Sequence, residues 1–180
     1  MRRVVTGIDD NGNSVFVSDE ELEAIEAPTL GGVKNWLIWG QDETPLVPNE
    51  GAEPQGLNFF PVNSTGYRFL IFSYPPASHS SPAPDDMDAA IAETERLLPG
   101  MSSAVTSSGG THFTATVDLE YVLAGEFHLE LDNGESRTLK AGDSIVQHGP
   151  RHHWENRSET EWATMLLVFV GAEIDASRHS

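Results

Sequence analysis

The chain has 180 residues, and its 28 acidic against 10 basic side chains give a net charge of -18 at pH 7. A surface this acidic repels phosphate backbones and anionic lipid, so we expect binding to neither nucleic acid nor membrane surfaces. The chain has no cysteine, which excludes disulfides and thiolate metal sites, so any metal would have to be held by imidazole and carboxylate groups.

The sequence shows neither a membrane-spanning segment nor a targeting signal. No apolar stretch is long enough to span a bilayer. Arg2 and Arg3 are followed by Ile8-Asp9-Asp10 instead of an apolar segment, so the sequence shows no secretory signal. Together with the lack of cysteine, this favours a cytoplasmic protein.

Residues 1–84 alternate between short apolar runs and turn-forming residues. Asp10-Asn11-Gly12 predicts a turn, and the proline-containing residues 41–55 predict a surface loop. β-Branched and aromatic residues between such breaks are typical of strands. Strands are predicted at Val15–Val17, Trp36–Gly40 and Tyr67–Tyr74.

Residues 85–110 predict one helix and a loop. Asp85 or Asp86 can cap a helix that continues to Leu98 and is ended by Pro99-Gly100. The apolar face of this helix is predicted to comprise Met87, Ile91, Thr94 and Leu98. The Ser/Gly-rich segment from Ser102 to Gly110 predicts a mobile loop that leads directly into His112.

Residues 111–171 have an all-β pattern, and residues 172–180 form a tail. Gly-containing turns at Asp132-Asn133-Gly134 and Ala141-Gly142-Asp143 separate short apolar segments, as in a sandwich or barrel. The nearly continuous apolar run Thr164–Val170 predicts a strand buried on both faces. The other strands are predicted at Thr116–Leu123, Phe127–Leu131 and Ile145–Val146.

The polar groups able to carry chemistry also lie in this all-β half. His112 opens it, Asp118 and Glu120 follow, and His152 comes after the turn at Gly142. In a barrel, side chains this far apart in sequence can converge on one point.

Two segments resemble the two motifs of the cupin family. Gly142-Asp143, a strand, a Gly-containing turn, His152 and then Asn156 resemble the second motif. His112, Asp118 and Gly125 resemble the first motif, in which a His-x-His pair precedes a carboxylate and a glycine. The chain is thus similar to small single-domain cupins. This resemblance implies an all-β fold, the cupin double-stranded β-helix or jelly-roll-like barrel, with one short helix and N-terminal strand extensions.

The resemblance also implies a metal site, with two departures from the general motif. Thr114 stands where the second histidine of the His-x-His pair would be, and the carboxylate is the aspartate Asp118. The implied metal ligands are therefore His112, Asp118 and His152. Two imidazoles and one carboxylate with open positions suit a divalent ion such as Fe, Mn, Ni or Zn.

Strand geometry restricts this site. Six residues of straight strand span about 20 Å, so the chain must turn between Thr114 and Val117 if His112 and Asp118 are to share an ion. Glu120 would then point to the same face as Asp118, and either side chain could be the carboxylate ligand. The separation from Gly125 favours Asp118, which leaves Glu120 as a candidate catalytic base. Asp118 could instead bond a backbone amide at the turn.

Further residues near these motifs have both a functional and a structural interpretation. Gln147 and Trp154 are candidate substrate-binding residues, although Gln147 could close a strand end and Trp154 could be plain core. His148 and His153 are expected to be solvated, and Asn156 is expected to bond backbone groups after the histidine turn.

The function that follows is a metal-binding cupin enzyme acting on a small organic molecule inside the barrel. Lyase, isomerase and dioxygenase chemistry are all compatible with such a site. The alternative is a non-catalytic small-ligand-binding module with a degenerate metal site, or a dimeric interaction partner. The resemblance also implies a homodimer paired through N-terminal strands within residues 1–84. Because residues 99–110 are rich in Ser and Gly and lead directly into His112, we predict that they form a mobile flap at the barrel mouth.

Overall fold

The computed structural model describes residues 1–79, 81, 84–102 and 111–177. Residues 103–110, which make up most of the predicted flap, lie outside this part of the chain. None of the described helices is long and apolar enough to cross a membrane. The described elements are β1 (Arg2–Ile8), β2 (Ser14–Glu21), β3 (Ile25–Glu26), β4 (Lys34–Gln41), β5 (Tyr67–Tyr74), α1 (Met87–Leu97), β6 (Thr116–Ala124), β7 (Glu126–Leu131), β8 (Ser136–Lys140), β9 (Ser144–His148), β10 (His152–Glu155) and β11 (Ala163–Gly171).

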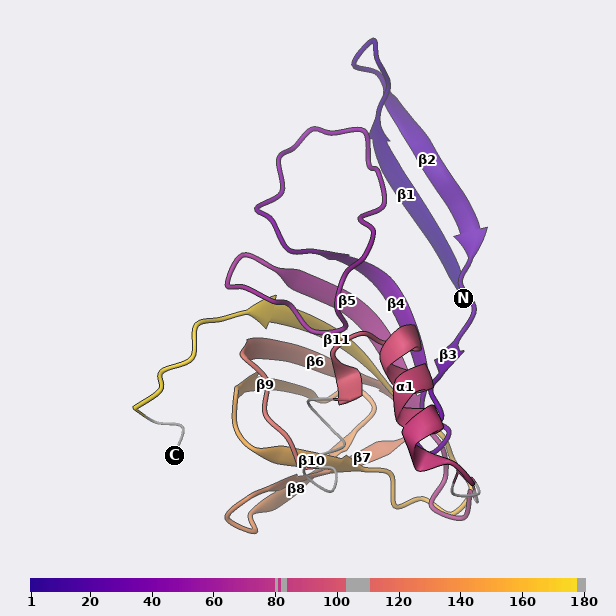
Figure 1. The fold of residues 1–180 in the computed structure, drawn as a ribbon, viewed down its shortest axis with the longest axis vertical. Helices are drawn as coiled ribbons and strands as arrows, with labels where there is room; N and C mark the ends of the chain where they lie inside the picture. Colours follow the sequence, from indigo (N-terminus) through magenta and orange to yellow (C-terminus); the bar gives the residue numbers. More distant parts are fainter. Residues whose placement is uncertain (80, 82–83, 103–110, 178–180) are drawn as a thin grey trace.

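Two antiparallel sheets form the barrel (Figure 1). The larger has the strand order β3-β4-β5-β11-β6-β9, and the smaller has the order β10-β7-β8. Leu70, Val122, Phe127, Met165 and Leu167 are at most 1% exposed and belong to one hydrophobic core. This architecture confirms the predicted all-β, cupin-type double-stranded β-helix.

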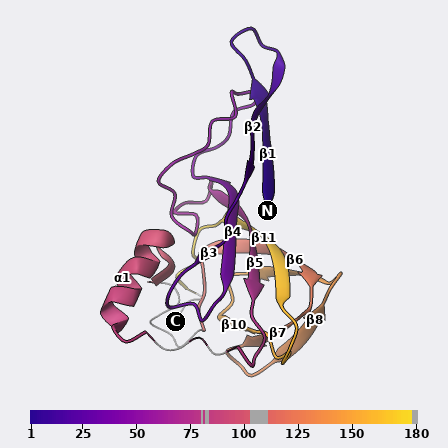
Figure 2. The same cartoon turned by 90° about the vertical axis from the view of Figure 1, so that its right-hand side faces the viewer.

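The first two strands form a separate hairpin that projects beyond the barrel (Figures 1 and 2). The buried side chain of Arg3 is one of its connections to the rest of the chain. The Arg3 guanidinium donates to the Ile38 carbonyl and forms ion pairs with Glu20 and Glu53, and it lies 5.5 Å from the centre of the Trp39 ring. The N-terminal segment thus has two parts, because β3, β4 and β5 belong to the larger sheet while the hairpin stands apart.

The predicted helix is confirmed, and its buried face agrees with the prediction except at Met87. Asp86 caps α1 by accepting a hydrogen bond from the Ala89 amide at 3.0 Å. Ala90 and Thr94 are buried, and the Thr94 hydroxyl lies 2.9 Å from the Thr29 hydroxyl. On the predicted apolar face, Leu98 is also buried and Ile91 is partly buried, whereas Met87, the first residue of the helix, is 50% exposed.

The strand β11 corrects the prediction of burial on both faces. It lies between β5 and β6, and its inward residues Met165, Leu167 and Phe169 are buried. On the opposite face Val170 is 38% exposed, and Leu166 and Val168 are only partly buried. The apolar run therefore reflects a buried inner face and an outer face that the described part of the chain leaves partly open.

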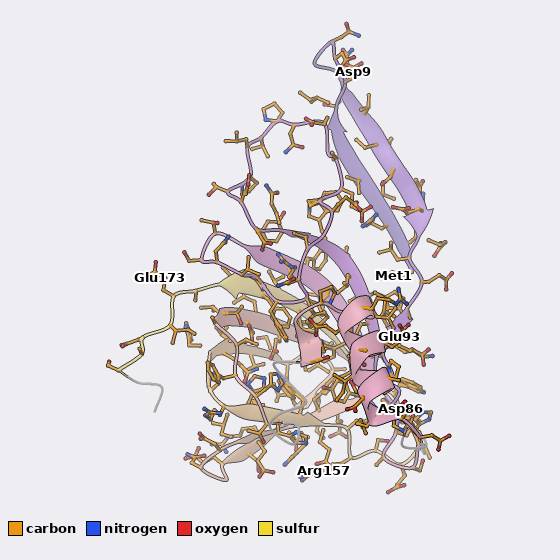
Figure 3. The ribbon with its side chains drawn as sticks, viewed as in Figure 1. Met1, Asp9, Asp86, Glu93, Arg157 and Glu173 are labelled. Carbon is orange, nitrogen blue, oxygen red and sulfur yellow. The ribbon has the colours of Figure 1, made fainter. Side chains whose placement is uncertain are left out.

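Many charged side chains lie at the periphery. Figure 3 shows Asp9 at the hairpin tip, Glu93 on α1 and Glu173 after β11, all at the outer edge of the molecule. This arrangement agrees with the net charge of -18.

Candidate active site

The barrel holds a cavity of about 340 Å³. Its polar groups come mainly from β6 and from the segments around His112 and His152. Much of the remaining wall is aromatic, formed by Phe59, Phe60, Phe72, Tyr74, Trp154 and Phe169. A mostly apolar cavity with a few convergent polar groups is the usual form of a small-molecule site.

His112 and His152 meet at this cavity, as the motif positions predict. The chain bends at Ala115 before β6 begins at Thr116, so the required turn is present. His112 forms an isolated bridge with His152 through two backbone hydrogen bonds of 3.0 Å. The two imidazole ring centres are 4.6 Å apart. The predicted convergence of these two side chains is thus confirmed.

His152 is held in one tautomer. Its Nδ1 lies 2.9 Å from the Pro150 carbonyl oxygen, which can only accept, so Nδ1 carries the proton. Burial lowers the pKa of His152 to about 4. The ring is therefore neutral at pH 7, and its Nε2 keeps a lone pair.

Asp118 lies on the inner face of β6 and is bonded by hydroxyl groups. The Thr116 hydroxyl donates to the Asp118 carboxylate at 2.5 Å, and the Thr114 hydroxyl lies 2.6 Å from that of Thr116. Burial raises the pKa of Asp118 to about 6, against the opposing effect of these threonines. Thr114, which replaces the motif histidine, therefore belongs to a hydroxyl chain that ends at the carboxylate.

Glu120 is the second carboxyl group on this face, two residues along β6. Burial, reinforced by the charge of Asp118, raises the pKa of Glu120 to about 8, so it is mainly protonated at pH 7. The Gln147 Nε2 group is 3.3 Å from both carboxyl oxygens of Glu120. Gln147 is buried behind this carboxyl group, and it does not line the cavity. Its position favours holding Glu120 over the predicted contact with substrate.

The remaining predicted residues divide between wall and scaffold. Trp154 lines the cavity and is buried. His153 also lines the cavity and is partly buried, so it is less exposed than expected. His148 is exposed, as expected. The Asn156 amide donates to the carbonyls of Tyr74, Pro75 and Glu161, which confirms its structural role.

The sequence interpretation missed Tyr74, the last residue of β5. Its ring lines the cavity beside Phe72 and Phe127, with centre-to-centre distances of 5.2 and 5.5 Å. Burial, with a contribution from the charge of Glu120, raises the pKa of Tyr74 to about 12. Strand alternation could have predicted this position. Side chains of alternate strand residues point to the same face, so Tyr74 shares a face with Leu70 and Phe72.

The implied metal ligands have suitable chemistry but are not grouped as a metal site. His112, Asp118 and His152 all line one cavity. Two imidazoles and one carboxylate are suitable ligands for a divalent ion. However, no three His or acidic side chains among the described residues are grouped so that they could hold a metal ion. The Asp118 carboxylate is instead bonded by Thr116. As arranged, these residues do not form a metal centre, and ligation by them stays a prediction.

Comparison with known proteins places the chain in a family. No protein-family model matches it. The oryzines biosynthesis cluster protein J of Aspergillus oryzae is 31% identical over 147 residues, which cover 74% of this chain and 79% of that protein. The cupin-domain-containing oxidoreductase fogC of Aspergillus ruber is 27% identical over 171 residues, covering 93% of this chain and 70% of fogC. The chain therefore belongs to the same family as protein J, within the cupin superfamily.

Other similarities are shorter or more distant. Two phomopsin biosynthesis cluster proteins of Diaporthe leptostromiformis are 50% identical over 62 residues, a match that spans only 33% of their length. Among solved structures, the Schizosaccharomyces pombe Cnp3 cupin domain is 8% identical, with 99% of this chain and 93% of that chain covered and a TM-score of 0.49.

Proposed function

We propose that the chain is a cupin enzyme that moves protons on a small organic molecule held in the barrel, with Glu120 as the proton donor at neutral pH. The observation that carries this proposal is the buried pair Asp118 and Glu120, which face one cavity from one strand. Paired titratable groups whose environments separate their pKa values are typical of acid–base catalysts.

The environments of the two carboxyl groups assign opposite roles. With a pKa of about 6, Asp118 is largely ionised at pH 7 and can accept a proton. Glu120, with a pKa of about 8, keeps its proton and can donate it. In one turnover Asp118 takes a proton from a carbon next to a carbonyl group, and Glu120 delivers a proton to another atom of the same molecule. The product is an isomer, and exchange with solvent restores both protonation states.

The relatives support a role in small-molecule biosynthesis, because protein J and the phomopsin proteins are named for biosynthesis clusters. A metal-dependent oxidoreductase is the second candidate. It is favoured by the name of fogC and by the two imidazoles and one carboxylate that face the cavity. The two candidates differ in whether activity requires a divalent metal.

The test is metal analysis combined with proton exchange. Protein purified without an affinity tag is analysed for Fe, Mn, Ni and Zn, and is then incubated in D₂O with EDTA and neutral ketones such as β-tetralone. We expect exchange of the protons next to the carbonyl, measured by NMR, to exceed the buffer rate and to depend on Glu120. An exchange rate equal to that of buffer overturns the proposal. Exchange that EDTA removes and a divalent metal restores supports the metal-dependent candidate instead.

A further inference from the structure

The Tyr74 hydroxyl is a hydrogen-bond donor at the cavity wall. The ring is fixed on one side by Phe72 and Phe127, and the backbone is fixed by the Asn156 amide, 3.3 Å from the Tyr74 carbonyl oxygen. Within the described residues, the hydroxyl has no hydrogen-bond partner in the protein. Tyr74 is partly buried, and its hydroxyl is therefore available to donate to a molecule bound in the cavity.

The charges that face the cavity select against anions. Asp118 and Glu120 line it, while none of the described lysine or arginine side chains does. The histidine residues that line the wall are His112, His152 and His153. A carboxylate or phosphate placed beside the Asp118 carboxylate would have no permanent cation to compensate its charge.

The shape of the wall favours a ring-sized apolar molecule. Phe59, Phe60 and Phe169 pack edge to face or tilted, with ring centres 4.9 to 6.0 Å apart, and present their remaining surface to the cavity. A volume of about 340 Å³ is at the small end of ligand sites. It suits a molecule of one or two rings.

We propose that the cavity binds a neutral, mostly apolar molecule with a carbonyl oxygen, and that the Tyr74 hydroxyl donates the hydrogen bond to this oxygen. The inference rests on the proposed function in one respect, because a hydrogen bond to the carbonyl oxygen stabilises the negative charge that forms there when the neighbouring carbon loses a proton. Tyr74 is thereby a substrate-binding residue that also faces the reacting group.

Binding of three matched probes, measured by calorimetry at pH 7, tests the inference without turnover. The probes are the neutral ketone β-tetralone, its hydrocarbon tetralin and the anion β-naphthoate. We expect β-tetralone to bind at least tenfold more tightly than β-naphthoate. Tyr74→Phe should weaken β-tetralone binding about fivefold to tenfold, the usual size of one lost hydrogen bond, and should leave tetralin binding unchanged.

Tyr121→Phe is the matched control, because Tyr121 lies on the outward face of β6 and is 46% exposed. It should bind all three probes as the wild type does. Equal losses for β-tetralone and tetralin in Tyr74→Phe would reduce Tyr74 to a packing residue and overturn the inference. So would β-naphthoate binding as tightly as β-tetralone, or a wild type that binds none of the probes. Selective β-tetralone binding without proton exchange would overturn the proposed function alone.

Discussion

The two faces of β6 invert the usual relation between polarity and burial. Asp118 and Glu120 point into the barrel and are 2% and 5% exposed, whereas Leu119 and Tyr121 point outward and are 42% and 46% exposed. Burying two carboxyl groups costs free energy unless they are paired, and exposing apolar side chains gives up the gain of burial. A strand that tolerates both costs indicates a chemical role for the inner face and a contact role for the outer face.

The largest effect is expected on the inner face. Glu120→Gln keeps the size and the hydrogen-bonding capacity of the side chain but removes its transferable proton. We expect the rate of proton exchange to fall about 100-fold or more, the usual contribution of a general acid or base. The control is Glu130→Gln, an exposed position of β7, which should exchange at the wild-type rate. Retention of the full rate in Glu120→Gln would leave the inner face without its assigned proton donor.

The outer face provides the next contrast. Val117, Leu119, Tyr121 and Leu123 on β6 carry no charge, and across the ladder Leu119 is paired with Val146 and Val168. We propose that a second copy of the chain covers this face. A twofold contact places the same patch on itself, so two chains of charge -18 can meet there without burying carboxylates.

Sedimentation velocity tests this dimer. We expect the wild type to be a dimer, and Leu119→Asp to weaken association about 100-fold, because it places an unpaired charge in an apolar contact. Phe16→Asp is the comparison, since Phe16 is 79% exposed on the projecting hairpin. If only Phe16→Asp dissociates the dimer, the interface is the N-terminal hairpin that the family resemblance implied. A monomeric wild type would contradict the proposal that the outer face of β6 is a dimer interface.

The sequence predicts those features of the two faces that depend on local patterns or motifs, and it does not predict those that depend on tertiary packing. The bounds of β5 follow from its apolar pattern and the prolines that end it, which are local signals. The convergence of His112 with His152 follows instead from the resemblance to the two cupin motifs. The position of Gln147 behind Glu120 and the contribution of Phe59 to the cavity depend on tertiary packing. The apolar residues of β11 show the limit most clearly, because an apolar pattern does not distinguish a face buried within one chain from a face left open for a partner.

The buried carboxyl group of Glu120 should also make the free energy of unfolding depend on pH. The folded-state pKa of Glu120, about 8, lies above its ordinary value of 4.5. Between these values the unfolded chain releases a proton that the folded chain retains, so this group makes the free energy of unfolding fall as pH rises. Glu120→Gln should therefore be more stable than the wild type by about 2–4 kcal/mol at pH 8, and the gain should vanish below pH 4.5. Urea unfolding at both pH values measures this, and a gain that is independent of pH would contradict it.

The smallest expected effect separates the two carboxyl groups. If Asp118 is the base and Glu120 the acid, the rate of proton exchange should rise with pH near 6 and fall near 8. Thr116→Val removes the hydroxyl that donates to the Asp118 carboxylate. Because that hydrogen bond favours the ionised form, its loss should move the acidic limb to higher pH by about 0.5 to 1 unit.

The alkaline limb, which belongs to Glu120, should stay in place, and the rate at the optimum should change less than about twofold, since Thr116 touches neither Glu120 nor the cavity wall. The corresponding substitution on the other face, Thr164→Val on β11, is the control. Its hydroxyl bonds that of Ser73, so both limbs should remain unchanged. A shift of both limbs by Thr116→Val would show that the carboxyl groups titrate as one coupled pair. A shift of the alkaline limb alone would exchange their roles, with Asp118 as the acid and Glu120 as the base.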